Sequence, residues 1–126
     1  MDTVSVRYIV DDVDAAVQFY TTHLGFELEM QPAPGFAMLS RGRLRLLLNA
    51  PGAGGAGRAG ADEAAPAPGG WSRFQITTDD LDAMIDRLRD SGIAFRSDLV
   101  EGKGGRQVLV EDPAGNPIEL FEPARS

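Results

Sequence analysis

The chain has 126 residues, 43% of them hydrophobic and 25% charged, which is the composition of an ordinary globular protein of one domain or two very small ones. A formal net charge of −7 would repel the phosphates of nucleic acid and an anionic membrane surface, so we expect neither as a partner. The absence of cysteine excludes disulfides and thiolate ligands and agrees with a cytoplasmic location, which we expect because no signal-peptide pattern or long apolar run is present.

Residues 1–50 predict a strand, a helix and three further strands. Asp11 or Asp12 can cap the first turn of the helix, and an apolar stripe with i, i+3, i+4 and i+7 spacing continues until Gly25, which is placed to end it. The predicted strands alternate apolar and polar residues between short turn sequences, over about residues 4–10, 26–31, 36–40 and 43–49.

Residues 51–70 differ sharply from the rest of the chain, because almost all of them are Gly, Ala or Pro. Such a segment offers few side chains to bury against the entropic cost of ordering its backbone. We expect either a linker or a loop that acts as a lid over a binding site, and the composition does not decide between the two.

Residues 71–122 repeat the pattern of the first half. The run Asp11-Asp12-Val13-Asp14-Ala15 aligns without a gap with Asp79-Asp80-Leu81-Asp82-Ala83. A second amphipathic helix is therefore predicted, with Gly92 at its end. The accompanying strands are expected over about residues 72–78, 94–99, 106–111 and 117–122.

Each half thus predicts a βαβββ module. One such module leaves strand edges and a sheet face uncovered, so two modules are expected to pair around a shared core. We predict an α+β fold with a single domain over residues 1–126, in which two pseudo-symmetric modules form curled mixed sheets around a cup. We also expect a homodimer, and the cup could be built within one chain or across two.

The segments "DDVDAAVQFY", "LGF", "DDLDAMIDRLRDSGIAF" and "DPAGNPIELFEP" resemble the vicinal oxygen chelate superfamily. This superfamily includes glyoxalase I, extradiol dioxygenases, fosfomycin-resistance transferases and bleomycin-resistance proteins. The resemblance spans nearly the whole chain apart from the linker. It implies the double βαβββ fold and, for the enzymes, a metal bound at four pseudo-equivalent positions, at the start of the first strand and in the last strand of each half.

The four positions that would hold a metal carry unsuitable side chains. They fall on Ser5, Arg45, Arg73 and Glu119. An arginine has no lone pair to offer a cation and stays charged at working pH. One hydroxyl and one carboxylate make a poor site for a divalent transition metal. We therefore expect no metal and no other cofactor.

Strand alternation predicts which side chains face the cup. If Val6, Tyr8 and Val10 pack under a helix, the residues between them face the other way. Trp71 follows the linker, where it could stack on a planar ligand or anchor the entry of a strand. Glu119 could also pair with Arg73 or Arg45 in a purely structural role. The predicted ligand-binding residues are Ser5, Arg7, Arg45, Leu47, Trp71, Arg73, Gln75, Glu119 and Phe121.

Apolar walls with a few fixed polar groups are typical of small-molecule sites. The leading interpretation is a metal-free protein that binds a small organic molecule in the cup for sequestration or resistance, as the bleomycin-resistance branch does. The alternative is a cofactor-independent isomerase or lyase with Glu119 as its general base. A third possibility is an interaction module without any ligand.

Overall fold

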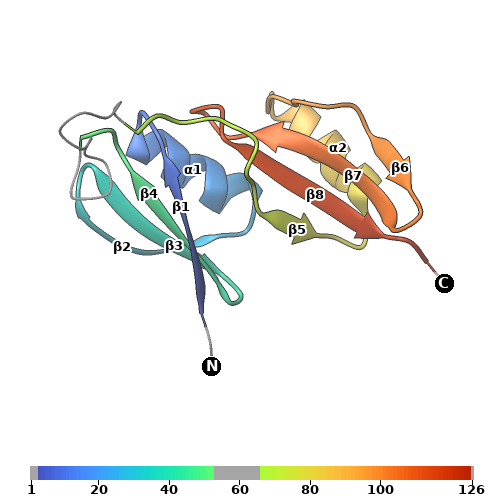
Figure 1. Ribbon diagram of the computed structural model, residues 1–126, viewed down its shortest axis with the longest axis horizontal. Helices are drawn as coiled ribbons and strands as arrows, with labels where there is room; N and C mark the ends of the chain where they lie inside the picture. Colours follow the sequence, from blue (N-terminus) through green and yellow to red (C-terminus); the bar gives the residue numbers. More distant parts are fainter. Residues whose placement is uncertain (1–2, 53–65, 126) are drawn as a thin grey trace. The chain divides into compact units, whose positions relative to one another are not determined.

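The structure is a computed structural model that describes residues 3–52 and 66–125. The predicted linker or lid at residues 51–70 lies largely outside the described residues. The chain divides into two compact units, Met1–Gly69 with Pro113–Gly115, and Gly70–Asp112 with Asn116–Ser126. Each unit carries one βαβββ module, called here the first and the second module (Figure 1).

The first module builds one four-stranded mixed sheet with a helix against it. Its elements in chain order are β1 (Val4–Ile9), α1 (Val13–His23), β2 (Glu27–Ala33), β3 (Phe36–Arg41) and β4 (Leu44–Asn49). The strands lie in the order β1-β4-β3-β2, with β1 parallel to β4 and the other pairs antiparallel. Helix α1 contacts β2, β3 and β4, and Figure 1 shows it behind this sheet.

The second module repeats this topology. Its elements are β5 (Gln75–Thr77), α2 (Leu81–Asp90), β6 (Val100–Gly102), β7 (Gly105–Glu111) and β8 (Pro117–Pro123). The sheet order is β5-β8-β7-β6, with β5 parallel to β8 and the remaining pairs antiparallel. The predicted α+β fold with two βαβββ modules is confirmed. Neither helix in the described ranges is long and apolar enough to cross a membrane.

Equivalent aspartates begin the two helices. The Asp12 carboxylate accepts a hydrogen bond from the Ala15 amide at 3.1 Å, and the Asp80 carboxylate accepts one from the Ala83 amide at 3.0 Å. Each side chain satisfies an amide that has no partner inside the helix. The second aspartate of each Asp-Asp pair is therefore the cap.

In each module one face of the sheet is buried under the helix. In the first module the buried side chains alternate along β4, where Leu46 and Leu48 are fully buried, and Tyr20 of α1 is fully buried as well. The second module buries Val108 and Val110 of β7 in the same way. Alternation leaves the opposite face of each sheet with polar and half-buried side chains. We call these the open faces.

The predicted strand over residues 94–99 is wrong. Phe95 makes only an isolated bridge with Val110, and the strand at this edge of the sheet is β6, which lies between the predicted strands 94–99 and 106–111. The Ser97 hydroxyl accepts a hydrogen bond from the Leu109 amide at 3.0 Å, whereas the Arg96 amide donates to the Leu109 backbone oxygen, so side-chain and backbone bonds together replace a regular ladder here. The turn between β6 and β7 has two residues, Lys103 and Gly104.

Candidate functional site

On the open face of the second module, the Glu119 carboxylate is held by two neighbouring side chains. Its Oε1 accepts hydrogen bonds from Arg73 Nε at 3.1 Å and Arg73 Nη2 at 2.9 Å. Its Oε2 accepts one from Gln75 Nε2 at 2.5 Å. Parallel pairing of β5 with β8 sets Gln75 directly beside Glu119, which explains the short reach. We call Arg73, Gln75 and Glu119 the Glu119 triad.

Within the Glu119 triad, both oxygens of the Glu119 carboxylate accept hydrogen bonds. The Glu119 side chain is 12% exposed and the Arg73 side chain 28% exposed, so the ion pair is partly shielded from water. A charge-assisted pair of this kind is stronger than a neutral hydrogen bond and orients both partners. Of the two partners that the sequence left open for Glu119, the structure selects Arg73.

The side chains at the four metal-ligand positions do not fit a divalent metal. Ser5 lies beside Arg45 in the register of β1 and β4, and Arg73 pairs with Glu119. Two arginines offer no lone pair, and the carboxylate already accepts hydrogen bonds on both oxygens. Within residues 3–52 and 66–125 no three His, Cys, Asp or Glu side chains are grouped so that they could hold a metal ion.

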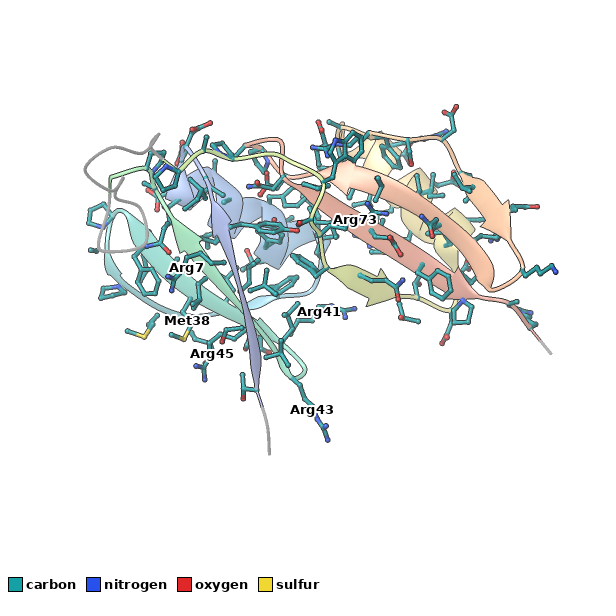
Figure 2. All side chains as sticks on the ribbon, viewed as in Figure 1. Arg7, Met38, Arg41, Arg43, Arg45 and Arg73 are labelled. Atoms are coloured by element: carbon teal, nitrogen blue, oxygen red, sulfur yellow. The ribbon has the colours of Figure 1, made fainter. Side chains whose placement is uncertain are left out.

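The open face of the first module carries two arginines. Register pairs Ser5 with Arg45 in one row across the sheet and Arg7 with Leu47 in the next row. Both arginines are exposed, and neither forms an ion pair with any residue that the structure describes. Figure 2 labels both on this sheet, on strands β1 and β4.

Three residues of this face were not predicted from the sequence. Met38 of β3 lies beside Leu47, and Met30 of β2 lies beside Met38, so the row that begins with Arg7 continues as an apolar strip. Asn49 follows Leu47 on β4 with the same parity and is 5% exposed, and its buried Oδ1 has no hydrogen-bond partner within residues 3–52 and 66–125. Extending the alternation from Arg45 and Leu47 to β3 and to the end of β4 would have found Met38 and Asn49.

Trp71 and Phe121 occupy different surroundings. Phe121 is half-buried on β8 beside Thr77, two residues beyond Glu119 and therefore on the same face. Trp71 is 69% exposed, and its ring lies against the guanidinium of Arg96, which is 4.7 Å from the ring centroid. Arg96 also binds Glu111 at 2.9 Å, so Trp71 is attached to the strand entry while most of its surface stays accessible.

A pocket of about 530 Å³ lies elsewhere on the second module, and it was not predicted. Arg106 in its lining forms ion pairs with Asp82, at 3.1 Å, and with Glu122. These hydrogen bonds, first to Asp82 and then to Glu122, raise the pKa of Arg106 above its ordinary value. The pocket holds none of the predicted site residues, and its lining includes Asp79, Asp82, Glu101, Arg106, Glu122 and Arg125.

The comparison with known proteins agrees with this architecture. The model of the Glyoxalase/Bleomycin resistance protein/Dioxygenase superfamily matches residues 3–120, and the chain belongs to this superfamily. No curated protein sequence matches the chain.

Solved structures of this fold include a lyase and a binding protein that have similar sequence identity to this chain. Lactoylglutathione lyase from Agrobacterium tumefaciens is 28% identical, with a TM-score of 0.73 over 94% of this chain and 91% of that chain. TnmS3, an antibiotic binding protein from Streptomyces sp. CB03234, is 27% identical, with a TM-score of 0.73 over 98% of this chain and 97% of that chain. TioX from Micromonospora sp. ML1 is 19% identical, with a TM-score of 0.78 over 98% of this chain and 100% of that chain, and shows the fold alone.

Proposed function

We propose that this chain binds a small organic molecule without a bound metal, on the open faces of its sheets, and that it sequesters the molecule rather than converting it. The observation that carries the proposal is the Glu119 triad. At the position where a metal-binding relative needs a free carboxylate, Glu119 is already bound on both oxygens by Arg73 and Gln75. The similarity to TnmS3, an antibiotic binding protein, supports a binding role.

The remaining predicted residues suit recognition. Ser5, Arg7 and Arg45 are polar and exposed on one open face, and Leu47 beside them is half-buried. Phe121 adds apolar surface on the other open face. Polar groups set in apolar surroundings orient a ligand, and the apolar contact supplies much of its affinity. The predicted cup and homodimer stay predictions.

Metal analysis tests the metal-free part of the proposal. Protein purified without chelators should contain substoichiometric nickel, zinc, iron and manganese, and added metal should leave its thermal midpoint unchanged, because the donor set of Ser5, Arg45, Arg73 and Glu119 is unsuitable. Elemental analysis and thermal unfolding measure both quantities. A stoichiometric metal that survives dialysis and raises the midpoint would contradict the proposal.

A second candidate function is a cofactor-independent lyase or isomerase with Glu119 as general base. The 28% identity with a lactoylglutathione lyase favours it. A general base needs a lone pair that is free to reach the substrate proton. The Glu119 carboxylate has about four lone-pair sites, and Arg73 and Gln75 already occupy three of them, so only one site on Oε2 remains for a substrate proton. For this reason we place the enzyme second.

The substitution Glu119→Gln separates the two functions. A binding protein should keep its fold, and its free energy of unfolding should fall by about 1 kcal/mol because the ion pair is weakened. Its ligand affinity should change only modestly. An enzyme should lose turnover about 100-fold or more. Glu101→Gln is the matched control, because Glu101 is exposed on β6, outside the predicted site. A large loss of turnover in Glu119→Gln but not in Glu101→Gln would overturn the binding function and support the enzymatic one.

A further inference from the structure

We infer that the ligand is an amphipathic monocarboxylate, whose carboxylate is bound by Arg7 and Arg45 and whose apolar part lies on Met38 and Leu47. This inference rests on the proposed small-molecule binding and adds the chemical class of the ligand. It concerns the open face of the first module alone. The three observations behind it are the positions of the two arginines, their lack of acidic partners among the described residues, and the apolar strip beside them.

Strand register brings the two arginines together. Ser5 pairs with Arg45 and Arg7 pairs with Leu47, so the arginines lie on adjacent strands, displaced by two residues along the strand. With strands ~4.8 Å apart and a rise of ~3.3 Å per residue, their Cα atoms are about 8 Å from one another on the same face. Two arginine side chains at this spacing can turn their guanidinium groups toward one carboxylate.

No acidic side chain in the described part of the chain forms an ion pair with these two arginines. The other site arginine, Arg73, is paired with Glu119, and Arg96 and Arg106 are paired with acids as well. Arg7 and Arg45 form no ion pair with the described part of the chain, although the protein has 19 acidic residues against 12 lysines and arginines. Glu29 on the same sheet accepts a hydrogen bond from Ser40 instead, at 2.5 Å.

Unpaired arginines on one face of an acidic protein favour an anion with a small charge. Each arginine adds local attraction for an anion, whereas the net charge of −7 repels a polyanion more strongly than a monoanion. A planar carboxylate also matches the fork of donors on a guanidinium group. Of the anionic ligands, a monocarboxylate therefore fits this face best.

The apolar strip specifies the rest of the ligand. From Arg7 the row runs through Leu47 and Met38 to Met30, which is 45% exposed. Figure 2 labels Met38 on the same sheet as Arg7 and Arg45. Methionine is flexible and polarizable and adapts to flat apolar or aromatic groups.

The test measures binding of a panel of aromatic and aliphatic monocarboxylates, each matched by its primary amide, with inorganic phosphate as a further probe. Isothermal titration calorimetry on the full chain at low salt should show at least one acid that binds about tenfold or more tightly than its amide. Arg45→Ala and Arg7→Ala should each remove most of this preference and leave amide binding nearly unchanged. Both side chains are exposed, so the variants should fold, which circular dichroism checks.

Arg43→Ala is the matched control, because it removes the same charge from the exposed turn between β3 and β4. It should keep the preference for acids. An equal loss in Arg43→Ala would mean that only overall charge matters and would overturn the inference, as would tight binding of phosphate that these acids do not match. If acids and amides bind equally, small-molecule binding stands and the carboxylate inference falls. If no probe and no member of a wider library of small molecules binds, the proposed function itself falls.

Discussion

Replacing Gly105 with alanine should destabilise the second module by about 3–4 kcal/mol, the largest effect that we expect from a single substitution. Gly105 has φ +146°, and a Cβ added there would lie 2.1 Å from the backbone oxygen of Glu122 and 3.0 Å from the amide of Ala124. Backbone atoms of β8 cannot turn aside as a flexible side chain could. Urea denaturation measures the loss as a lower unfolding midpoint.

Gly104→Ala is the control for this substitution. Gly104 precedes Gly105, and a Cβ built on it meets nothing within 4 Å. Its replacement should change the free energy of unfolding by less than about 0.5 kcal/mol. Equal losses in the two variants would contradict the structure of this hairpin. The result also concerns the candidate site, because the pairing of β7 with β8 that begins at Gly105 places Leu109 opposite Glu119.

Replacing Asp112 with alanine should cost about 2 kcal/mol, the second largest effect. The Asp112 carboxylate accepts hydrogen bonds from the Asn116 amide at 2.8 Å and from Asn116 Nδ2 at 3.0 Å, and Asp112 is only 4% exposed. Alanine would leave these donors buried without their acceptor, which costs more than the hydrogen bonds contribute when formed. Thermal or urea unfolding measures the loss.

Two further variants sharpen this prediction. Asp112→Asn keeps one acceptor oxygen in the turn and should lose about half as much stability as Asp112→Ala. Asp98→Ala removes an exposed aspartate and should change stability by less than about 0.5 kcal/mol. If Asp112→Ala is no more harmful than Asp98→Ala, the Asp112–Asn116 contact is not what holds the turn before β8. This turn is part of the "DPAGNP" sequence, so its chemistry explains the most specific motif of the chain.

Much of the fold could be predicted because it repeats. The gapless match between the two Asp-Asp runs, the amphipathic stripes and the glycines after each helix are confirmed by two helices with equivalent aspartate caps and by positive φ at Gly25 and Gly92. These signals are local, since a helix cap and a turn are decided within a few residues. The prediction of a strand over residues 94–99 was wrong, because Ser97 and Arg96 bind groups on β7 that only folding brings near.

The candidate site was predictable in part. Alternation assigned Ser5, Arg7, Arg45 and Leu47 to one face, which agrees with the register of β1 and β4. It could not choose between Arg73 and Arg45 as the partner of Glu119, since both alternatives satisfy the same parity. The choice follows from the parallel pairing of β5 with β8, which places Gln75 beside Glu119 and the preceding Arg73 within reach of its carboxylate.

The amino-acid sequence was sufficient for the family and the doubled βαβββ pattern, because residue type and local periodicity decide both, and it also gave the residue types at positions 5, 45, 73 and 119. The distribution of charge over those positions was decided only by tertiary structure. Contacts between strands far apart in the chain neutralise Arg73 and leave Arg7 and Arg45 without an acidic partner among the described residues. Electrostatic pairing depends on distances of a few ångströms, which no one-dimensional pattern contains.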